Sequence, residues 1–109
     1  MKFIIKQDIL MESLNHTARA ISPRNLIPIL TGIKFELKEE GLYLSSSDTD
    51  ISIRCLIPTD KIIEVVQLGS IVIGGKYIVD IIRKLPNMDI TIEVMDGYKM
   101  IVSTDNTEF

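Results

Sequence analysis

Two short stretches of the chain hold a basic residue in a setting that suits an anion, and the first surrounds Arg24. This arginine stands between Pro23 and Pro28, and no acidic residue occurs over residues 18–35. Proline fixes φ and removes a backbone donor, so the sequence predicts a stiff loop rather than a helix at the start of residues 22–32. A guanidinium held on such a loop matches the geometry of a phosphate. A solvated loop arginine is the plainer interpretation.

The second stretch is Gly74-Gly75-Lys76, which follows a strand pattern and opens a helical one. Free backbone N–H groups at a helix N-terminus favour a phosphate, and a lysine there adds charge. The stretch is not a nucleotide P-loop, because Ser70 and Tyr77 stand where that motif requires glycine and serine or threonine. Three interpretations remain: a backbone phosphate contact, a plain strand–helix turn, and a phosphate-binding enzyme.

Other reactive side chains give weaker patterns. Residues 45–50 combine hydroxyls with two carboxylates, but they lack the glycine and the glutamate that a calcium loop requires, so a hairpin turn explains them better. His16 is the sole histidine, and Cys55, as the sole cysteine, allows neither an internal disulfide nor a cysteine metal site. We therefore predict no catalytic residue, no metal ligand and no cofactor.

The composition is that of one soluble domain over residues 1–109, with 46% hydrophobic and 25% charged residues. The apolar runs are too short to span a membrane, and the apolar start is too short for a signal peptide. These features predict a cytoplasmic protein.

The charges are distributed unevenly around a net charge of −3. Residues 8–30 and 74–86 together hold five basic and three acidic residues, whereas the remainder holds seven basic and twelve acidic ones. This segregation predicts a mildly positive face on an acidic body. The five basic residues are Arg19, Arg24, Lys76, Arg83 and Lys84.

Two amphipathic helices would position these charges. The first is expected over residues 8–21, with Asp8 as N-cap, and the second over residues 76–85, closed by Pro86. Their apolar stripes are Leu10, Leu14, Ala18 and Ile21, then Ile78, Ile81, Ile82 and Leu85. Their polar stripes are Glu12, Asn15, His16 and Arg19, then Lys76, Asp80, Arg83 and Lys84. The matching stripes predict that both helices pack side by side on one face of a sheet, with the polar stripes outward.

Period-two alternation predicts seven strands, and Asp96-Gly97 gives the strongest hairpin signal. The strands are expected over residues 2–7, 29–37, 42–46, 51–57, 70–73, 90–94 and 98–104. Residues 59–68 fit either a short helix or irregular apolar packing.

The order strand–helix–strand–strand–strand is followed by strand–helix–strand–strand. This predicts an α+β fold built from a duplicated β-α-β-β-β unit, with two helices on one face of the sheet. The second unit lacks its last strand, so we expect the chain to be a truncated piece of a longer protein. An unpaired sheet edge is then expected near residues 98–109.

These features, taken together, resemble the first domain of the bacterial β sliding clamp, the beta subunit of DNA polymerase III. The matching residues are Met1-Lys2-Phe3, Pro23-Arg24, Ile27-Pro28-Ile29-Leu30-Thr31-Gly32-Ile33, Asp48-Thr49-Asp50, and Lys76 through Asp80 to Arg83-Lys84-Leu85-Pro86. In that family three such domains follow one another in each subunit. Two subunits join head to tail into a ring around duplex DNA, with helices lining the hole and sheets outside.

The resemblance implies a non-enzymatic processivity factor that tethers the replicative polymerase. It carries Arg24 onto a DNA-contacting arginine and Lys76 onto a basic position that also approaches DNA. The match is less strict for Arg19, Arg83 and Lys84. These residues would contribute only to the electric field in the hole of the ring. The implied partners are duplex DNA, bound without sequence preference, and a second subunit. DNA polymerase III and the clamp loader would bind through later domains.

Residues 103–109 align near the edge that meets the second subunit. The alternative to the clamp is a small non-enzymatic protein-interaction or regulatory domain whose basic face is incidental.

Overall fold

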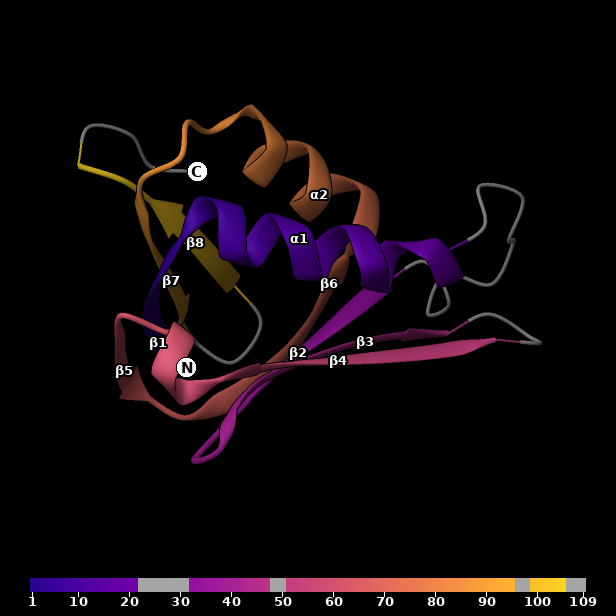
Figure 1. Ribbon diagram of the computed structural model, residues 1–109, viewed down its shortest axis with the longest axis horizontal. Helices are drawn as coiled ribbons and strands as arrows, with labels where there is room; N and C mark the ends of the chain where they lie inside the picture. The colour runs from indigo at the N-terminus through magenta and orange to yellow at the C-terminus, as the bar shows by residue number, and fades with distance from the viewer. Residues whose placement is uncertain (22–31, 48–50, 96–98, 106–109) are drawn as a thin grey trace.

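The computed structural model describes residues 1–21, 32–47, 51–95 and 99–105 of the chain (Figure 1). Its two α-helices are α1 (Gln7–Thr17) and α2 (Gly75–Lys84). Short 3₁₀ turns lie at Ala18–Ala20 and Thr59–Lys61. The strands are β1 (Lys2–Lys6), β2 (Gly32–Lys38), β3 (Gly41–Ser47), β4 (Ser52–Pro58), β5 (Glu64–Gln67), β6 (Gly69–Gly74), β7 (Asp89–Met95) and β8 (Lys99–Ser103).

The strands form two antiparallel sheets rather than the single sheet expected from the sequence. We call them the β1 sheet, in the order β5-β1-β7-β8, and the β2 sheet, in the order β4-β3-β2-β6. The strands on either side of each helix do not pair with each other. Instead, β1 pairs with β7 and β2 pairs with β6. Each helix therefore carries the chain from one sheet to the other.

This exchange of strands confirms the α+β fold and agrees with an internal duplication. The series β1-α1-β2-β3 and β6-α2-β7-β8 occupy equivalent places, because each contributes one strand to one sheet and two to the other. The strand missed by the sequence patterns is β5. It has four residues without alternation, and its antiparallel pairing with β1, which aligns Phe3 with Val65, stabilises it.

The helix α1 begins one residue before Asp8, so the prediction of Asp8 as N-cap was wrong. The preceding Lys6 has extended backbone and makes no side-chain cap. The Gln7 N–H instead donates to the Met88 carbonyl over 2.9 Å, which satisfies one donor of the first turn from a neighbouring loop. The Asp8 side chain accepts from the Ile9 N–H at 2.8 Å.

The core lies between the two helices and the inner faces of the sheets. Leu10 and Leu14 of α1 are fully buried, as is Ile82 of α2, whereas Ile78 retains 2% exposure. Burying one such side chain contributes roughly 1.5–3 kcal/mol. Their burial confirms these four positions of the predicted apolar stripes. The other four positions are only partly buried but pack against the same core: Ala18, Ile21, Ile81 and Leu85. The two helices also contact each other on the same side of the sheets, as expected (Figure 1).

Side-chain hydrogen bonds fix the antiparallel arrangement of the helices. The Gln7 amide Nε2, at the start of α1, donates to the Ile82 carbonyl near the end of α2 over 2.8 Å. At the other end of α1, the Ser46 hydroxyl of β3 donates to the buried carbonyl of Thr17. The segment that carries Arg19 is thereby held against the β2 sheet.

Within the described parts of the chain, neither helix is long and apolar enough to cross a membrane.

Candidate nucleic-acid interface

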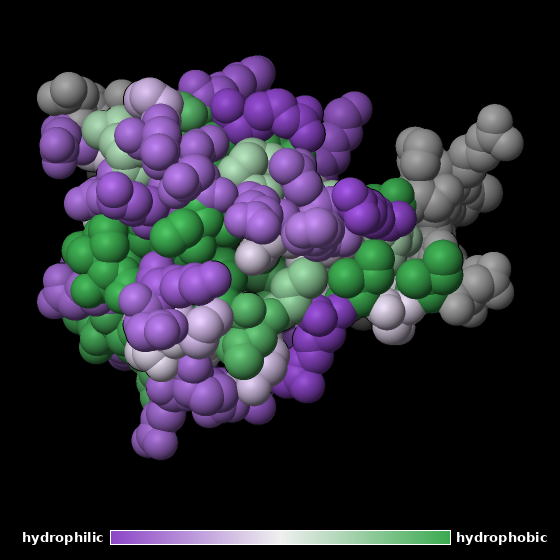
Figure 2. All heavy atoms as spheres, in the orientation of Figure 1, coloured by the Kyte–Doolittle hydropathy of each residue, from purple (hydrophilic) through white to green (hydrophobic). Residues whose placement is uncertain are grey.

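A cleft of about 270 Å³ lies where the end of α1 meets the first turns of α2. The antiparallel packing of the helices creates it, because the 3₁₀ turn after α1 lies beside the N-terminal half of α2. Its lining residues are Ala18, Ile21, Gly75, Lys76, Val79, Asp80 and Arg83. In Figure 2, which has the orientation of Figure 1, hydrophilic side chains predominate over the helices at the top of the view. The described lining of the cleft thus combines apolar side chains with two cations, Lys76 and Arg83, and one carboxylate, Asp80.

Lys76 lies in the first turn of α2 and is exposed, as predicted. The helix starts directly after β6, and Gly74 offers no side chain to cap it. The first turn also contains no acidic residue. Unpaired N–H groups and the helix dipole make this end positive, so a lysine there costs some helix stability. The arrangement is therefore better suited to attracting an anion than to stabilising the helix.

Arg83 and Lys84 lie in the last turn of α2 and are both exposed. Arg83 lines the cleft with Lys76, whereas Lys84 does not. The Arg83 Nη1 lies 3.7 Å from the Asp80 Oδ1, and both side chains are substantially exposed. Exposed pairs of this kind contribute about 0.2–1 kcal/mol. Cations at a helix C-terminus are favourable in any case, so a structural role explains these two residues as well as a functional one.

Arg19 is exposed in the 3₁₀ turn and follows Ala18, which lines the cleft. Arg24 lies outside the described residues, so its predicted role stays a prediction. In the structure, Lys76 and Arg83 thus line the same cleft. Arg19 is adjacent in the sequence to a residue that lines it. Lys84 lies on the same helix but outside this cleft.

The polar stripe of α1 is exposed as expected, but part of it borders a different groove. Glu12 and His16 line a hollow of about 510 Å³ between α1 and the edge strand β4, together with Cys55 and Lys61. The sequence held no signal for this groove, because it depends on how β4 packs beneath α1.

The enzyme interpretation gains no support from the cleft. Among the described residues, its lining side chains include one carboxylate, Asp80, which is paired with Arg83, and no histidine, cysteine or serine. Across the described residues, no three histidine, cysteine or acidic side chains gather as a metal site would require. Of the conceivable metal loop at residues 45–50, residues 48–50 lie outside the described residues.

Two antiparallel helices backed by two sheets that exchange strands, with basic residues on the helix side, define a domain of the DNA-clamp class. All of residues 1–109 match the family model for the DNA polymerase III beta subunit, N-terminal domain, and the chain belongs to that family.

Individual relatives agree with this assignment. The chain is 40% identical to the beta sliding clamp of Staphylococcus epidermidis, over 100% of this chain and 30% of that protein. The DNA polymerase sliding clamp of Bacillus subtilis superposes with a TM-score of 0.94 at 40% identity, again over 100% and 30% of the two chains. The beta subunit from the DNA polymerase of Streptococcus pyogenes gives 0.93 at 30% identity, over 100% and 29%. The chain thus spans about 30% of the length of these relatives.

Proposed function

We propose that this chain forms the first domain of a ring-shaped sliding clamp that encircles duplex DNA and tethers the replicative polymerase to it. The observation that carries the proposal is the superposition of the whole chain on the sliding clamp of Bacillus subtilis, with a TM-score of 0.94. A separate protein-interaction domain would not require this exchange of strands or two helices with exposed basic ends. The clamp proposal is therefore preferred to that alternative.

The proposed mechanism is enclosure rather than tight binding. A ring that encloses DNA needs few contacts, and contacts to phosphate oxygens carry no sequence information. Each exposed cation–phosphate contact is weak and falls with salt, so the ring can move along the duplex. The net charge of −3 is consistent with a domain that does not hold DNA by itself.

The spacing of cations along α2 suits a duplex that lies across the helix. Lys76 and Arg83 are seven residues apart on one side of α2, which corresponds to about 10 Å along the helix axis. The major groove of B-DNA is about 12 Å wide. The two side chains would therefore reach phosphates on opposite borders of the groove. Near the start of α2, Arg24 and Arg19 would add phosphate contacts or positive charge. Lys84 would add only to the electric field around the DNA.

The proposed partners follow from the ring. A second subunit would join head to tail near residues 103–109, where β8, within the described residues, pairs with β7 alone. DNA polymerase III and the clamp loader would bind through later domains, and the protein would act as a non-catalytic subunit. A cytoplasmic location is part of the proposal, because the polymerase would act there.

A chimaeric clamp would test the proposal directly. This chain would replace the first domain of the Bacillus subtilis sliding clamp, and primer extension by the cognate polymerase would be measured on a long primed template. The proposal expects long products that depend on the clamp loader. A folded chimaera that dimerises yet gives only the short products of the polymerase alone would contradict it.

A further inference from the structure

The face of the β2 sheet that points away from the helices carries charges that the proposed clamp mechanism does not use. Ile33, Phe35 and Leu37 of β2 are buried against the helices, so the alternate residues point outward. The strand register aligns four outward residues in one row across the sheet: Val72, Lys34, Ser45 and Arg54. We call this surface the outer face of the β2 sheet.

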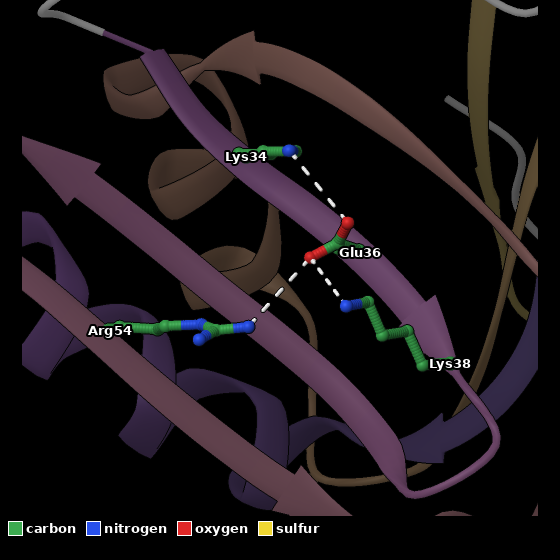
Figure 3. A network of polar contacts seen from close by, with 4 residues as sticks. All are labelled: Lys34, Glu36, Lys38 and Arg54. Carbon is green, nitrogen blue, oxygen red and sulfur yellow. Dashed lines mark ion pairs between the residues drawn. The ribbon is translucent and has the colours of Figure 1, made fainter.

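On this outer face, one carboxylate forms ion pairs with three cations (Figure 3). Glu36 lies 3.8 Å from Lys34 Nζ, 3.7 Å from Lys38 Nζ and 3.9 Å from Arg54 Nη2. These distances are at the long end for ion pairs, and all three cationic side chains are about half exposed. The four residues carry a net charge of +2. Much of the hydrogen-bonding capacity of the cations is therefore free for another anion.

The neighbouring Tyr43 holds Arg54 in position. The guanidinium carbon of Arg54 lies 4.0 Å from the centroid of the Tyr43 ring, and Lys38 Nζ lies 5.6 Å from it. Stacking of this kind restricts the guanidinium before any ligand arrives, which lowers the entropy that binding must offset. Desolvation, with a hydrogen bond to Glu40 and its negative charge, raises the pKa of the Tyr43 hydroxyl. The tyrosine therefore adds no negative charge at neutral pH.

A shallow hollow of about 390 Å³ lies beside Lys34 and Arg54. Its described polar lining residues are those two cations with Ser45, Ser46, Ser47 and Ser52, and Val72 forms part of its apolar wall. The Ser46 hydroxyl already donates to the Thr17 carbonyl. Glu36 and Lys38 do not line it, and none of its described lining residues is acidic. Two strands that share a neighbouring strand, such as β2 and β4, lie about 10 Å apart. A carboxylate between Lys34 and Arg54 would therefore have a cation on each side. The serine hydroxyls can donate to its remaining lone pairs.

We propose that the outer face of the β2 sheet binds an acidic, extended segment of a protein partner, with a carboxylate in the hollow between Lys34 and Arg54. Arginine pairs well with carboxylates through its fork of donors. A nucleic acid fits this face less well, because Arg54 covers the Tyr43 ring on which a base would stack. Glu36 would also repel a continuous run of phosphates.

Fluorescence anisotropy with a labelled peptide of alternating aspartate and glycine tests the proposal, using the 109-residue chain at low ionic strength. The double variant Lys34→Gln with Arg54→Gln should weaken binding roughly tenfold, because each exposed charge contact contributes up to about fivefold. Lys38→Gln is the matched control, since Lys38 shares Glu36 but does not line the hollow. It should change the affinity by less than about twofold. Glu36→Gln should tighten binding, because it removes the competing carboxylate.

Three results would overturn the proposal: equal binding of an alternating asparagine–glycine peptide, equal losses in Lys38→Gln and in the double variant, or tighter binding of an oligodeoxythymidylate of the same charge. Unchanged or weaker binding by Glu36→Gln would also overturn it. This variant keeps every cation, so its result decides the question even if the double variant folds poorly. None of these results bears on the proposed clamp, because all the variants lie on the sheet face opposite the helices.

Discussion

At the scale of single residues, Lys76 differs from the other cations of α2 in how it interacts with its own helix. Arg83 and Lys84 lie in the last turn, where the helix dipole favours positive charge, whereas Lys76 lies in the first turn, where the dipole opposes it. A residue that opposes local helix stability is more often retained for a function than for folding. This contrast separates Lys76 from a cation that is merely solvated.

The contrast predicts stability changes of opposite sign. Lys76→Glu should raise the free energy of unfolding by about 0.3–1 kcal/mol, and Lys84→Glu should lower it by a similar amount. Urea denaturation followed by circular dichroism measures both variants, and each is the control for the other. If both variants changed the free energy of unfolding equally and in the same direction, the helix dipole would not determine the effect of charge at these positions.

A second residue-scale prediction concerns DNA. In the proposed full-length clamp that contains this chain, replacing both Arg24 and Lys76 with glutamate should reduce loading onto nicked circular DNA. The deficit relative to the unmodified protein should shrink as salt rises, because salt weakens the phosphate contacts that the variant has lost. Folding should change by no more than about 1 kcal/mol. Lys38→Glu, on the outer face of the β2 sheet, is the control. Normal loading by a folded double variant would remove these two residues from the DNA-binding role and leave the fold assignment intact.

At the scale of elements, the pairing of α1 with α2 determines which side chains reach the cleft. The Gln7 amide connects the start of α1 to the Ile82 carbonyl, and this contact spans most of the sequence. The side-chain packing between the helices then sets the relative positions of Ala18, Lys76 and Arg83.

The variant Gln7→Leu should therefore lower the free energy of unfolding by about 1–2 kcal/mol, because the partly buried carbonyl loses its side-chain partner. Gln67→Leu, at an exposed position of β5, should change it by less than about 0.5 kcal/mol. Chemical denaturation measures both. The interpretation of Gln7 as the connection between the helices fails if the two variants are equally stable.

The open strand edges give a further element-scale prediction. Among the described residues, β8 pairs only with β7, and β6 pairs only with β2. Open edges invite pairing with another chain. Sedimentation of the 109-residue chain should show weak self-association. An extension at the C-terminus with the residues that would follow in the proposed full-length clamp should reduce it, and indifference to that extension would count against the predicted missing strand.

The elements also show how far the sequence could predict the structure. Within the described residues, periodicity located both α-helices and seven of the eight strands, because those patterns follow from burial on one face. It missed β5, whose four residues depend on pairing with the distant β1, and it could not divide the strands into two sheets. The candidate site was predicted in part: residue types singled out Lys76 and Arg83, but only packing revealed that Arg83 shares the cleft and Lys84 does not.

At the scale of the whole molecule, the proposed function depends on topology. Net charge is −3, so this chain alone should bind duplex DNA no more tightly than about 10⁻⁴ M at physiological salt. The proposed function requires that a much longer residence time arise from enclosure, since the exposed cations cannot supply it.

The most direct test is retention of the proposed full-length clamp on DNA of two topologies. The protein is loaded onto nicked circular DNA, passed through a gel-filtration column at moderate salt, and compared with an aliquot in which a restriction enzyme has linearised the circle. A clamp that encloses DNA should elute with the circular DNA and be lost from the linear DNA by sliding off the ends. Equal retention on circular and linear DNA, or loss from both despite active loader and intact dimer, would contradict it.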